Sequence, residues 1–409
     1  LSILDLINIK NLNFDGEIIF NGIKLNNLSF REFQKIRGKE ISIIFQEPMS
    51  SLNPSMKCGD QISEIILNHE KINKKNAKKK SLELIQKVQL KHSELIYEKY
   101  PHQLSGGQQQ RIMIAIAIAC KPKLLIADEP TTSLDSIVKN DIISLIKSLQ
   151  DEYKMSVLFI SHDLKLVAKF VDSLIILKNG LIIEKGVSSK VFKYPKSKYT
   201  QHLINSSPPT SNRPNRLITS KTKKNKLITK EERTLIHLKI YNKTPILKVN
   251  KLNVSYGYNK IIKDISFDLY RGETLGIVGE SGSGKSTIAK SILGIVKTEN
   301  GEVYFKDENI KNISNSVFRK KVQLIFQDPY SSLNPEVSVG RSIIEPMIAH
   351  KIFSSKKEMK IRVLELLNQV GLLESDYNKF PNQFSGGHRL RLFIARAFAL
   401  NPEIFICDE

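Results

Sequence analysis

Two blocks of sequence occur twice in this chain, and this repetition constrains the fold most strongly. IIFQEPMSSLNP at Ile43–Pro54 is identical to LIFQDPYSSLNP at Leu324–Pro335 at nine of twelve positions. Ser105–Glu129 and Ser385–Glu409 match at twelve of twenty-five positions. The offsets between the copies, 281 and 280 residues, are nearly equal. The pattern therefore indicates that one domain was duplicated in tandem.

The two copies are expected to be cut differently. We predict a first domain at residues 1–204, a linker at 205–244 rich in Ser, Pro, Asn and Lys, and a second domain at 245–409. Ser2–Asp5 aligns with Ser291–Gly294, so the first copy is expected to lack its beginning and the second its end. Lys230–Tyr241, at the end of the linker, is more apolar and is expected to form a short helix or strand.

The composition is that of a globular protein, with 41% hydrophobic and 25% charged residues. No apolar run approaches the roughly 18 residues of a membrane span, and the longest, Ile112–Cys120, has nine. The three cysteines, Cys58, Cys120 and Cys407, have no paired spacing. This argues against a disulfide framework or a zinc site and favours a reducing compartment.

Two stretches carry most of the formal net charge of +22. Residues 205–244 hold ten Lys/Arg against two Asp/Glu, and residues 71–80 hold six Lys and no acid. Neither stretch interleaves aromatic residues for base stacking. Solvated surface charge that can face anionic lipid is therefore favoured over nucleic-acid binding.

Short apolar runs alternate with helical patterns in each copy, which predicts a parallel α/β core. The expected strands are Leu124–Ala127, Val157–Ile160, Glu273–Val278 and Ile404–Cys407. Helical spacing covers Lys285–Lys297, and Asp60–Tyr100 and Gly340–Phe380 also read as helical. These last two segments lie between the same two motifs in each copy, so we expect a helical subdomain inserted into each core.

A glycine-rich segment, GESGSGKST, satisfies the pattern G-x-x-x-x-G-K-[ST] after an expected strand and before an expected helix. Backbone amides of such a loop and of the helix start cradle phosphates. Lys285 would reach the β- and γ-phosphates and Ser286 would bind Mg²⁺. The candidate nucleotide-binding residues here are Gly279, Glu280, Ser281, Gly282, Ser283, Gly284, Lys285, Ser286 and Thr287.

Acidic pairs close two of the expected strands, Asp128-Glu129 in the first copy and Asp408-Glu409 in the second. An Asp at the carboxyl end of a strand is well placed to hold Mg²⁺ beside a phosphate loop. The following Glu can polarise a water for attack on a γ-phosphate. LSGGQ at Leu104–Gln108 exposes backbone amides at a helix start, so Ser105, Gly106, Gly107 and Gln108 form a second candidate phosphate site, although Ser105 can also serve as a simple helix cap.

Taken in order, the phosphate loop, a Gln-containing loop (Gln46, Gln327), LSGGQ, a strand ending in Asp-Glu and a later Ser-His (His162) resemble the nucleotide-binding subunit of ABC transporters. The resemblance covers almost the whole chain outside the linker. SSLNP, and VFKYPKSKYTQHL at Val191–Leu203, resemble the dipeptide/oligopeptide/nickel importer branch in its fused tandem form.

The resemblance implies an α/β fold of two P-loop NTPase domains, each with a mainly parallel core, an antiparallel β part and a helical insertion. It implies ATP sandwiched between the phosphate loop of one domain and the signature of the other, with Asp135 near LSGGQ. Tyr256 would stack on adenine, with Tyr258 as the alternative. Implied catalytic residues are Glu409, Glu129, His162, Gln327 and Gln46, and implied Mg²⁺ ligands are Ser286, Gln327, Asp408 and Asp128.

The second signature departs from the family pattern, because Phe384 replaces Leu and His388 replaces Gln, while Ser385, Gly386 and Gly387 remain. We therefore expect the site that contains it to be the weaker one. The first copy shows no lysine-bearing loop and the second shows no Ser-His.

Two functions fit these motifs. The first is the energy-coupling ATPase of a peptide-type importer, with ATP and Mg²⁺ as cofactors, two permease subunits and an extracytoplasmic substrate-binding protein as partners, and no nucleic acid. It would lie peripherally at the cytoplasmic face of a bacterial inner membrane. The second is a soluble twin-ATPase of the translation-factor kind. That class would have a long charged helical linker, and Pro208, Pro209 and Pro214 oppose a helix here, so the importer is favoured.

Overall fold

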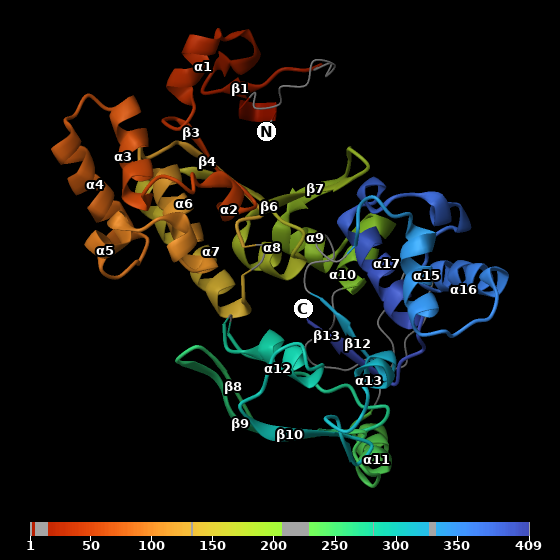
Figure 1. The fold of residues 1–409 in the computed structure, drawn as a ribbon. Coiled ribbons are helices and arrows are strands. Elements are labelled where there is room, and N and C mark those ends of the chain that lie inside the picture. The colour runs from red at the N-terminus through yellow and green to blue at the C-terminus, as the bar shows by residue number, and fades with distance from the viewer. Residues whose placement is uncertain are drawn as a thin grey trace. The chain divides into compact units, whose positions relative to one another are not determined.

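A computed structural model of the chain divides into two compact units, Leu1–Ile228 and Thr229–Glu409 (Figure 1). It describes residues 2–4, 15–131, 134–206, 229–280, 282–326 and 333–408. Within those ranges, no helix combines the length and apolar character that crossing a bilayer requires.

The first unit contains a three-stranded parallel sheet in the order β3 (Ile41–Ile44), β4 (Leu124–Asp128) and β5 (Ser156–Ile160). Ile41 pairs with Leu124, and Leu124 pairs with Ser156. The middle strand is buried over Leu125–Ala127, as expected for a strand covered on both faces. The strands predicted at Leu124–Ala127 and Val157–Ile160, and the parallel core, are confirmed.

Helices surround this sheet and share one apolar core with it. α3 (Cys58–His69), α4 (Lys74–Lys87) and α5 (Ser93–Glu98) form the predicted helical insertion. Ile62, Ile66 and Ile85 from the insertion are completely buried in the same cluster as residues of α6 (Gly106–Ile118) and α7 (Ser136–Tyr153). Burial of aliphatic side chains at this level stabilises each position by about 1.5–3 kcal/mol.

The remaining elements of the first unit are short, and their starts follow local capping rules. Ser29 and Glu32 form a capping box at α1, and Asp163 caps α8. The elements are η1 (Ser2–Leu4), β1 (Ile19–Phe20), β2 (Ile23–Lys24), η2 (Leu25–Asn27), α1 (Phe30–Ile36), α2 (Pro48–Ser51), η3 (Pro101–Gln103), α8 (Leu164–Phe170), β6 (Ser173–Lys178), β7 (Leu181–Val187), α9 (Ser188–Lys193) and α10 (Lys198–Ser206).

The second unit begins with α11 (Lys230–Tyr241), which settles the choice between helix and strand for that segment. An antiparallel sheet follows, in the order β11 (Glu308–Asn309), β10 (Asn300–Phe305), β8 (Leu247–Tyr256) and β9 (Asn259–Leu269). A separate parallel pair joins β12 (Val322–Ile325) to β13 (Ile404–Cys407). The strand predicted at Ile404–Cys407 and the expected antiparallel part are confirmed.

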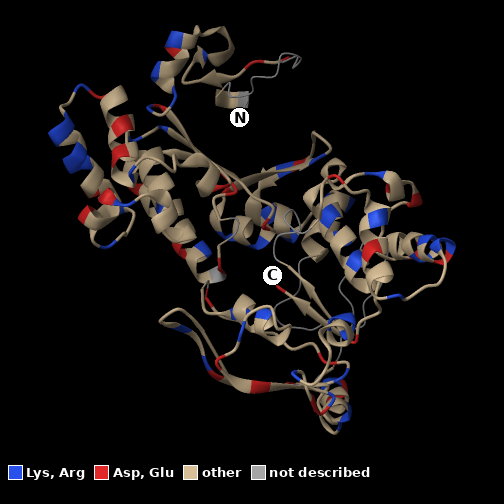
Figure 2. Ribbon diagram, viewed as in Figure 1, with Lys and Arg blue, Asp and Glu red and all other residues tan. Residues whose placement is uncertain are grey.

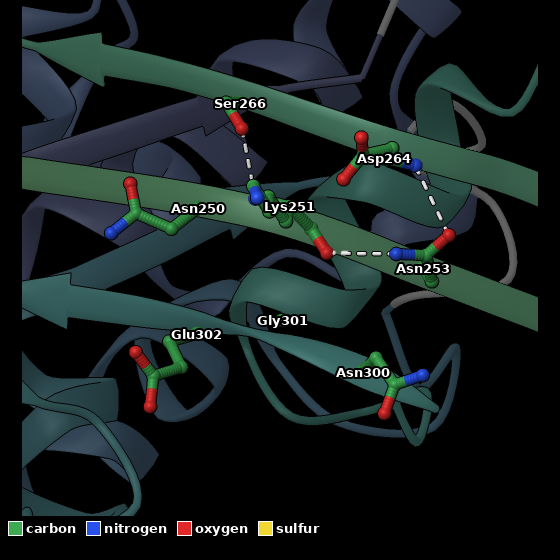
Figure 3. Close-up of a pocket in the computed structure, with 8 residues that line it drawn as sticks. All are labelled: Asn250, Lys251, Asn253, Asp264, Ser266, Asn300, Gly301 and Glu302. Carbon is green, nitrogen blue, oxygen red and sulfur yellow. Dashed lines mark hydrogen bonds between the residues drawn. The ribbon is translucent and has the colours of Figure 1, made fainter.

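The antiparallel sheet carries bulges that open a polar hollow on its surface (Figure 3). Lys251, Asp264 and Gly301 have positive φ angles of 44°, 53° and 99°. A Cβ at Gly301 would lie 2.5 Å from the carbonyl oxygen of Lys251, so only glycine fits. Polar side chains bond the backbone that the bulges free, as when Ser266 Oγ accepts from the Lys251 amide at 2.8 Å. The hollow is therefore accounted for by the bulges.

Two predictions about the second unit were wrong. Glu273–Val278 is not a strand, and Val278 is 93% exposed. A strand exists only where a neighbouring strand pairs with it, and no described strand pairs with this segment. In the second unit β13 pairs with β12 alone among the described residues, whereas β4, its counterpart in the first unit, also pairs with β5. The helix predicted at Lys285–Lys297 is α12 (Lys285–Ile292), which ends before Gly294 in the left-handed conformation, φ 65°.

A second helical insertion repeats the first within its own unit. α15 (Val339–Ala349), α16 (Lys356–Gln369) and α17 (Gly386–Phe398) enclose a core that includes Ile343, Val363 and Leu366. This confirms the helical segment predicted at Gly340–Phe380. The shorter elements are α13 (Asn315–Lys321), η4 (Glu374–Asn378) and η5 (Pro381–Gln383).

Candidate functional site

The glycine-rich loop of the second unit leads directly into α12. Gly284 is the residue before the helix, with φ 95°, and Gly282 has φ 81°. A Cβ on Gly284 would lie 2.5 Å from Ile262 Cδ1, so a larger residue would displace this side chain of β9 and also strain the backbone. These two glycines let the backbone turn sharply at the start of α12, where the first amides of the helix can bind a phosphate.

Lys285 folds its side chain back over this loop. Its Nζ donates hydrogen bonds to the carbonyl oxygens of Gly279 at 2.9 Å and Glu280 at 2.8 Å. An ammonium group held at the mouth of a loop of amides is a suitable partner for an anionic group. Ser283 and Thr287 belong to the same segment, whereas Ser281 lies outside the described residues.

The loop meets the end of a strand through one side-chain contact. Ser286 Oγ donates to Asp408 Oδ1 at 2.7 Å, although the two residues are 122 positions apart. Asp408 follows β13, and its amide donates to the Ile325 carbonyl of β12 at 2.9 Å. A hydroxyl and a carboxylate oxygen side by side are the hard oxygen ligands that Mg²⁺ prefers, so these residues fit that ion.

Three side chains of the first unit converge at the carboxyl ends of its parallel strands. Glu129, directly after β4, accepts a hydrogen bond from Gln46 Nε2 at 3.1 Å and contacts His162 Nδ1 through its other oxygen at 2.9 Å. Gln46 follows β3 and His162 follows β5. The Glu129 side chain is only 21% exposed, while that of His162 is 75% exposed. Asp128 ends β4 and is half-buried.

The backbone at Glu129 is strained. Its φ is 47°, in the left-handed region that residues with a side chain rarely occupy. Its amide donates to the Ile160 carbonyl at the end of β5 at 3.0 Å. Conformations of this kind cost about 1–3 kcal/mol and cluster at functional sites. The strain turns the carboxylate toward Gln46 and His162.

The signature of the first unit forms a closed capping box at α6. Ser105 Oγ accepts from the Gln108 amide at 3.4 Å, and Gln108 Oε1 accepts from the Ser105 amide at 3.1 Å. A Cβ on Gly107 would approach Val138 Cγ1 to 3.0 Å, so α7 packs against this turn. Asp135 caps α7 by accepting hydrogen bonds from the amides of Ile137 and Val138. Neither of these two bonds involves a signature glycine.

The second signature differs in detail. Ser385 precedes α17 but makes no side-chain capping bond. His388, which replaces the glutamine, packs edge-on against Phe384 with ring centroids 6.4 Å apart. Gly387 is exposed with open space around its Cα, and Gly386 starts the helix. The backbone turn is therefore retained while the capping box is not.

Two of the predicted residues have exposed side chains, and two others lie outside the described part of the chain. Tyr256, at the end of β8, is 50% exposed, and Tyr258 is fully exposed. The predicted residues Gln327 and Glu409 lie outside the described residues.

Two residues that the sequence analysis did not single out hold the signature turns. Gln109 Nε2 donates to the carbonyls of Pro101 at 2.8 Å and Leu104 at 3.2 Å. In the second copy, Arg389 Nε donates to the Phe384 carbonyl at 3.0 Å. The sequence did contain a sign of this role. Gln109 and Arg389 each follow directly after a signature and occupy equivalent positions of the repeat.

The comparisons with known proteins agree with this geometry. The ABC transporter family model matches residues 2–132 and 262–409. The glutathione import ATP-binding protein GsiA of Escherichia coli O157:H7 is 38% identical over 95% of this chain and 64% of its own length. The same protein of Salmonella choleraesuis is 40% identical with the same coverage. The chain thus spans 64% of the length of these relatives, less than two thirds.

Among solved structures, a dimeric ATP-binding cassette bound to ADP and Pi is 31% identical over 42% of this chain and 74% of its own, with a TM-score of 0.39. The α/β cores with their helical insertions have the P-loop NTPase fold of the ABC type. The chain belongs to the ABC transporter family. The two GsiA relatives are both named as glutathione import ATP-binding proteins.

Proposed function

We propose that this chain binds and hydrolyses ATP to energise an ABC importer of peptides or related solutes. The observation that carries the proposal is the 2.7 Å bond between Ser286 and Asp408, which joins the phosphate loop to the end of a strand. A phosphate loop and a metal-binding carboxylate in contact form the minimum needed to hold Mg²⁺ and a nucleoside triphosphate together.

The residues take the following roles in this proposal. Backbone amides of Gly279–Thr287 and Lys285 bind the phosphates, with Ser281 contributing its amide. Ser286 and Asp408 hold Mg²⁺, which supplies charge neutralisation at the β- and γ-phosphates. Gln327 and Asp128 are further proposed ligands, and Tyr256 or Tyr258 is proposed to stack on adenine.

Glu129 is the proposed general base of its unit, and Glu409 that of the other. The His162 and Gln46 contacts at 2.9 and 3.1 Å hold the Glu129 carboxylate in one orientation, so that it can accept a proton from a water aligned with the γ-phosphate. We further propose, from the family resemblance, that the signatures at Ser105–Gln108 and Ser385–Gly387 complete nucleotide sites begun by the phosphate loop of a different domain.

Partners and place follow from the relatives. Because GsiA is named for glutathione import, peptide-like solutes are the proposed cargo class. Two permease subunits, an extracytoplasmic substrate-binding protein and the cytoplasmic face of the inner membrane complete the proposal. The soluble twin-ATPase alternative receives no support from the relatives.

The first test is nucleotide binding by the purified chain. Lys285→Ala removes the only ammonium bonded to the loop carbonyls in the described residues, and should weaken fluorescent ATP binding by about 100-fold or more. Lys297→Ala, an exposed lysine after α12, is the matched control and should bind normally. Equal affinity for both variants and the wild type would refute the phosphate-loop assignment.

Transport requires a second test in cells. Deletion of the gene should abolish uptake of a labelled peptide-like solute, and the wild-type gene should restore it. Glu129→Gln keeps the size and one oxygen of the side chain but removes its basicity, and should restore less than a tenth of the uptake rate. Full restoration by that variant would exclude Glu129 as the base.

A further inference from the structure

Four lysines of the helical insertion in the first unit form what we call the lysine face. Lys71, Lys74, Lys75 and Lys79 are exposed and lie in the turn before α4 and on its first turns. No Asp or Glu occurs between residues 71 and 80. Figure 2 shows basic residues gathered at this end of α4. The face lies at least 25 residues in sequence from every residue assigned to ATP chemistry.

The neighbouring lysines of the same segment are neutralised, but these four are not. Lys78 bonds Glu98 at 3.2 Å, and Lys80 pairs with Glu70. Among the described residues, no ion pair involves Lys71, Lys74, Lys75 or Lys79. Their ammonium groups are available to an external anion.

Local stability does not explain this placement. Lys74 and Lys75 occupy the first turn of α4. This turn contains no acidic residue, and Asn73 is the side chain that caps its amides. The positive end of the helix dipole repels cations at this position. The buried side of the helix is carried by Ala77, Ser81 and Ile85, so the lysines contribute nothing to the core.

The second copy repeats part of the arrangement. α16 also begins with exposed lysines, Lys356 and Lys357, at the positions that correspond to Lys74 and Lys75. In both copies the lysine one turn later lies over a tyrosine ring, Lys78 over Tyr97 at 4.7 Å and Lys360 over Tyr377 at 5.5 Å. The later lysine thus has a packing role in each copy, while the first-turn lysines have none.

We propose that the lysine face binds the headgroups of an anionic phospholipid membrane. The face contains lysine alone, a flexible point charge, and no arginine fork for bidentate phosphate recognition. α4 also contains no aromatic residue on which a base can stack. Several lysines on one exposed helical segment attract a diffuse anionic surface such as a membrane. The binding free energy becomes more favourable with each added lysine.

The test measures binding of the purified chain to vesicles, without nucleotide. At about 0.1 M salt, vesicles with phosphatidylglycerol should bind the chain and vesicles of phosphatidylcholine alone should not. The variant Lys74→Glu/Lys75→Glu/Lys79→Glu should lower the affinity for phosphatidylglycerol vesicles on the order of 100-fold. Acidic residues in the first turn of a helix interact favourably with the helix dipole, so the thermal unfolding midpoint of this variant should equal or exceed that of the wild type. A loss of binding can therefore be distinguished from a loss of folding.

The matched control is Lys185→Glu/Lys190→Glu/Lys193→Glu, which changes the net charge equally at exposed positions of β7 and α9 in the same unit. It should bind within about threefold of the wild type. No binding by the wild type, or equal loss in both variants, overturns the proposal. Stronger binding to a single-stranded RNA oligonucleotide, lost in the lysine-face variant, would assign the face to nucleic acid instead. Since ATP plays no part in the assay, its result is independent of the proposed ATPase function.

Discussion

At the residue scale, Glu129 is held between Gln46 Nε2 at 3.1 Å and His162 Nδ1 at 2.9 Å. The phosphate loop and the strand-end acids were predicted from local pattern alone, because each needs only a few consecutive residues. The contacts of Glu129 were not predictable in this way. They join residues 83 and 33 positions apart and depend on β3, β4 and β5 lying in register. They also depend on a left-handed backbone at Glu129, which no sequence rule favours for glutamate.

Glu403 offers a test of electrostatics at the same scale. Its side chain is 13% exposed and contacts Lys306 at 2.8 Å and Lys321 at 3.0 Å, linking β10 to the parallel pair. The hydrogen bond from Lys306, followed by that from Lys321, lowers the pKa of Glu403 against the opposing effect of burial. Glu403→Gln should therefore destabilise the second unit by about 1–2 kcal/mol at pH 7, measured by urea denaturation.

The sign of the pH dependence follows from that lowered pKa. A carboxyl with a lower pKa in the folded state stabilises the fold above its unfolded value of 4.5 and loses this contribution as the pH falls through the folded value. The difference between wild type and variant should therefore shrink below pH 4.5. Glu365→Gln is the control. The Glu365 side chain is 55% exposed, so its ion pair with Arg362 should contribute under about 0.5 kcal/mol. Equal losses for both variants would contradict the argument.

The cysteines give a second residue-scale prediction. Burial raises the pKa of the Cys58 and Cys120 thiols to about 11, while Cys407 is exposed. At pH 8 roughly one in 1,000 such buried thiols is a thiolate, and access is restricted as well. Labelling with a thiol reagent should show one fast site that disappears in Cys407→Ser. The two slow sites should react about tenfold faster per pH unit between pH 8 and 10. A fast phase that persists in the variant would disprove the assignment.

At the element scale, helices and buried strands were predicted well, and the failure at Glu273–Val278 has a physical cause. The run has a sound β composition, but strand formation requires a hydrogen-bonded neighbour that local sequence does not reveal. The helix α12 was predicted to be too long because Ile295 and Val296 continue an apolar pattern past Gly294, where the positive φ ends it. Propensity and periodicity describe one segment, whereas pairing depends on two.

Hydrogen exchange would test the unpaired state of that segment. The amides of Leu275, Ile277 and Val278 should exchange on the order of 100-fold faster than those of Ile325 and Ile406 in the β12–β13 pair. Amide hydrogens that bond to water exchange freely, while those bonded between paired strands exchange only when the pair opens. Comparable protection at both places would show that Glu273–Val278 has a strand partner in solution.

At the scale of the whole molecule, duplication was the most informative property of the sequence, because it predicted two α/β cores with a helical insertion in each. The Gln46–Glu129–His162 cluster is described in the first unit, and the loop with Lys285 lies in the second.

The division has a consequence for nucleotide stoichiometry. The 409 residues contain one G-x-x-x-x-G-K-[ST] segment, at Gly279–Ser286. The triphosphate is bound chiefly by backbone amides and by the lysine of such a loop, so titration calorimetry with an ATP analogue should find one tight site per chain. Lys285→Ala should remove that site, and Gln46→Ala, which changes only the Glu129 cluster, should leave its affinity within about threefold. Two equivalent tight sites would mean that the first unit binds phosphate through groups other than a lysine-bearing loop, and would require a different account of the first copy.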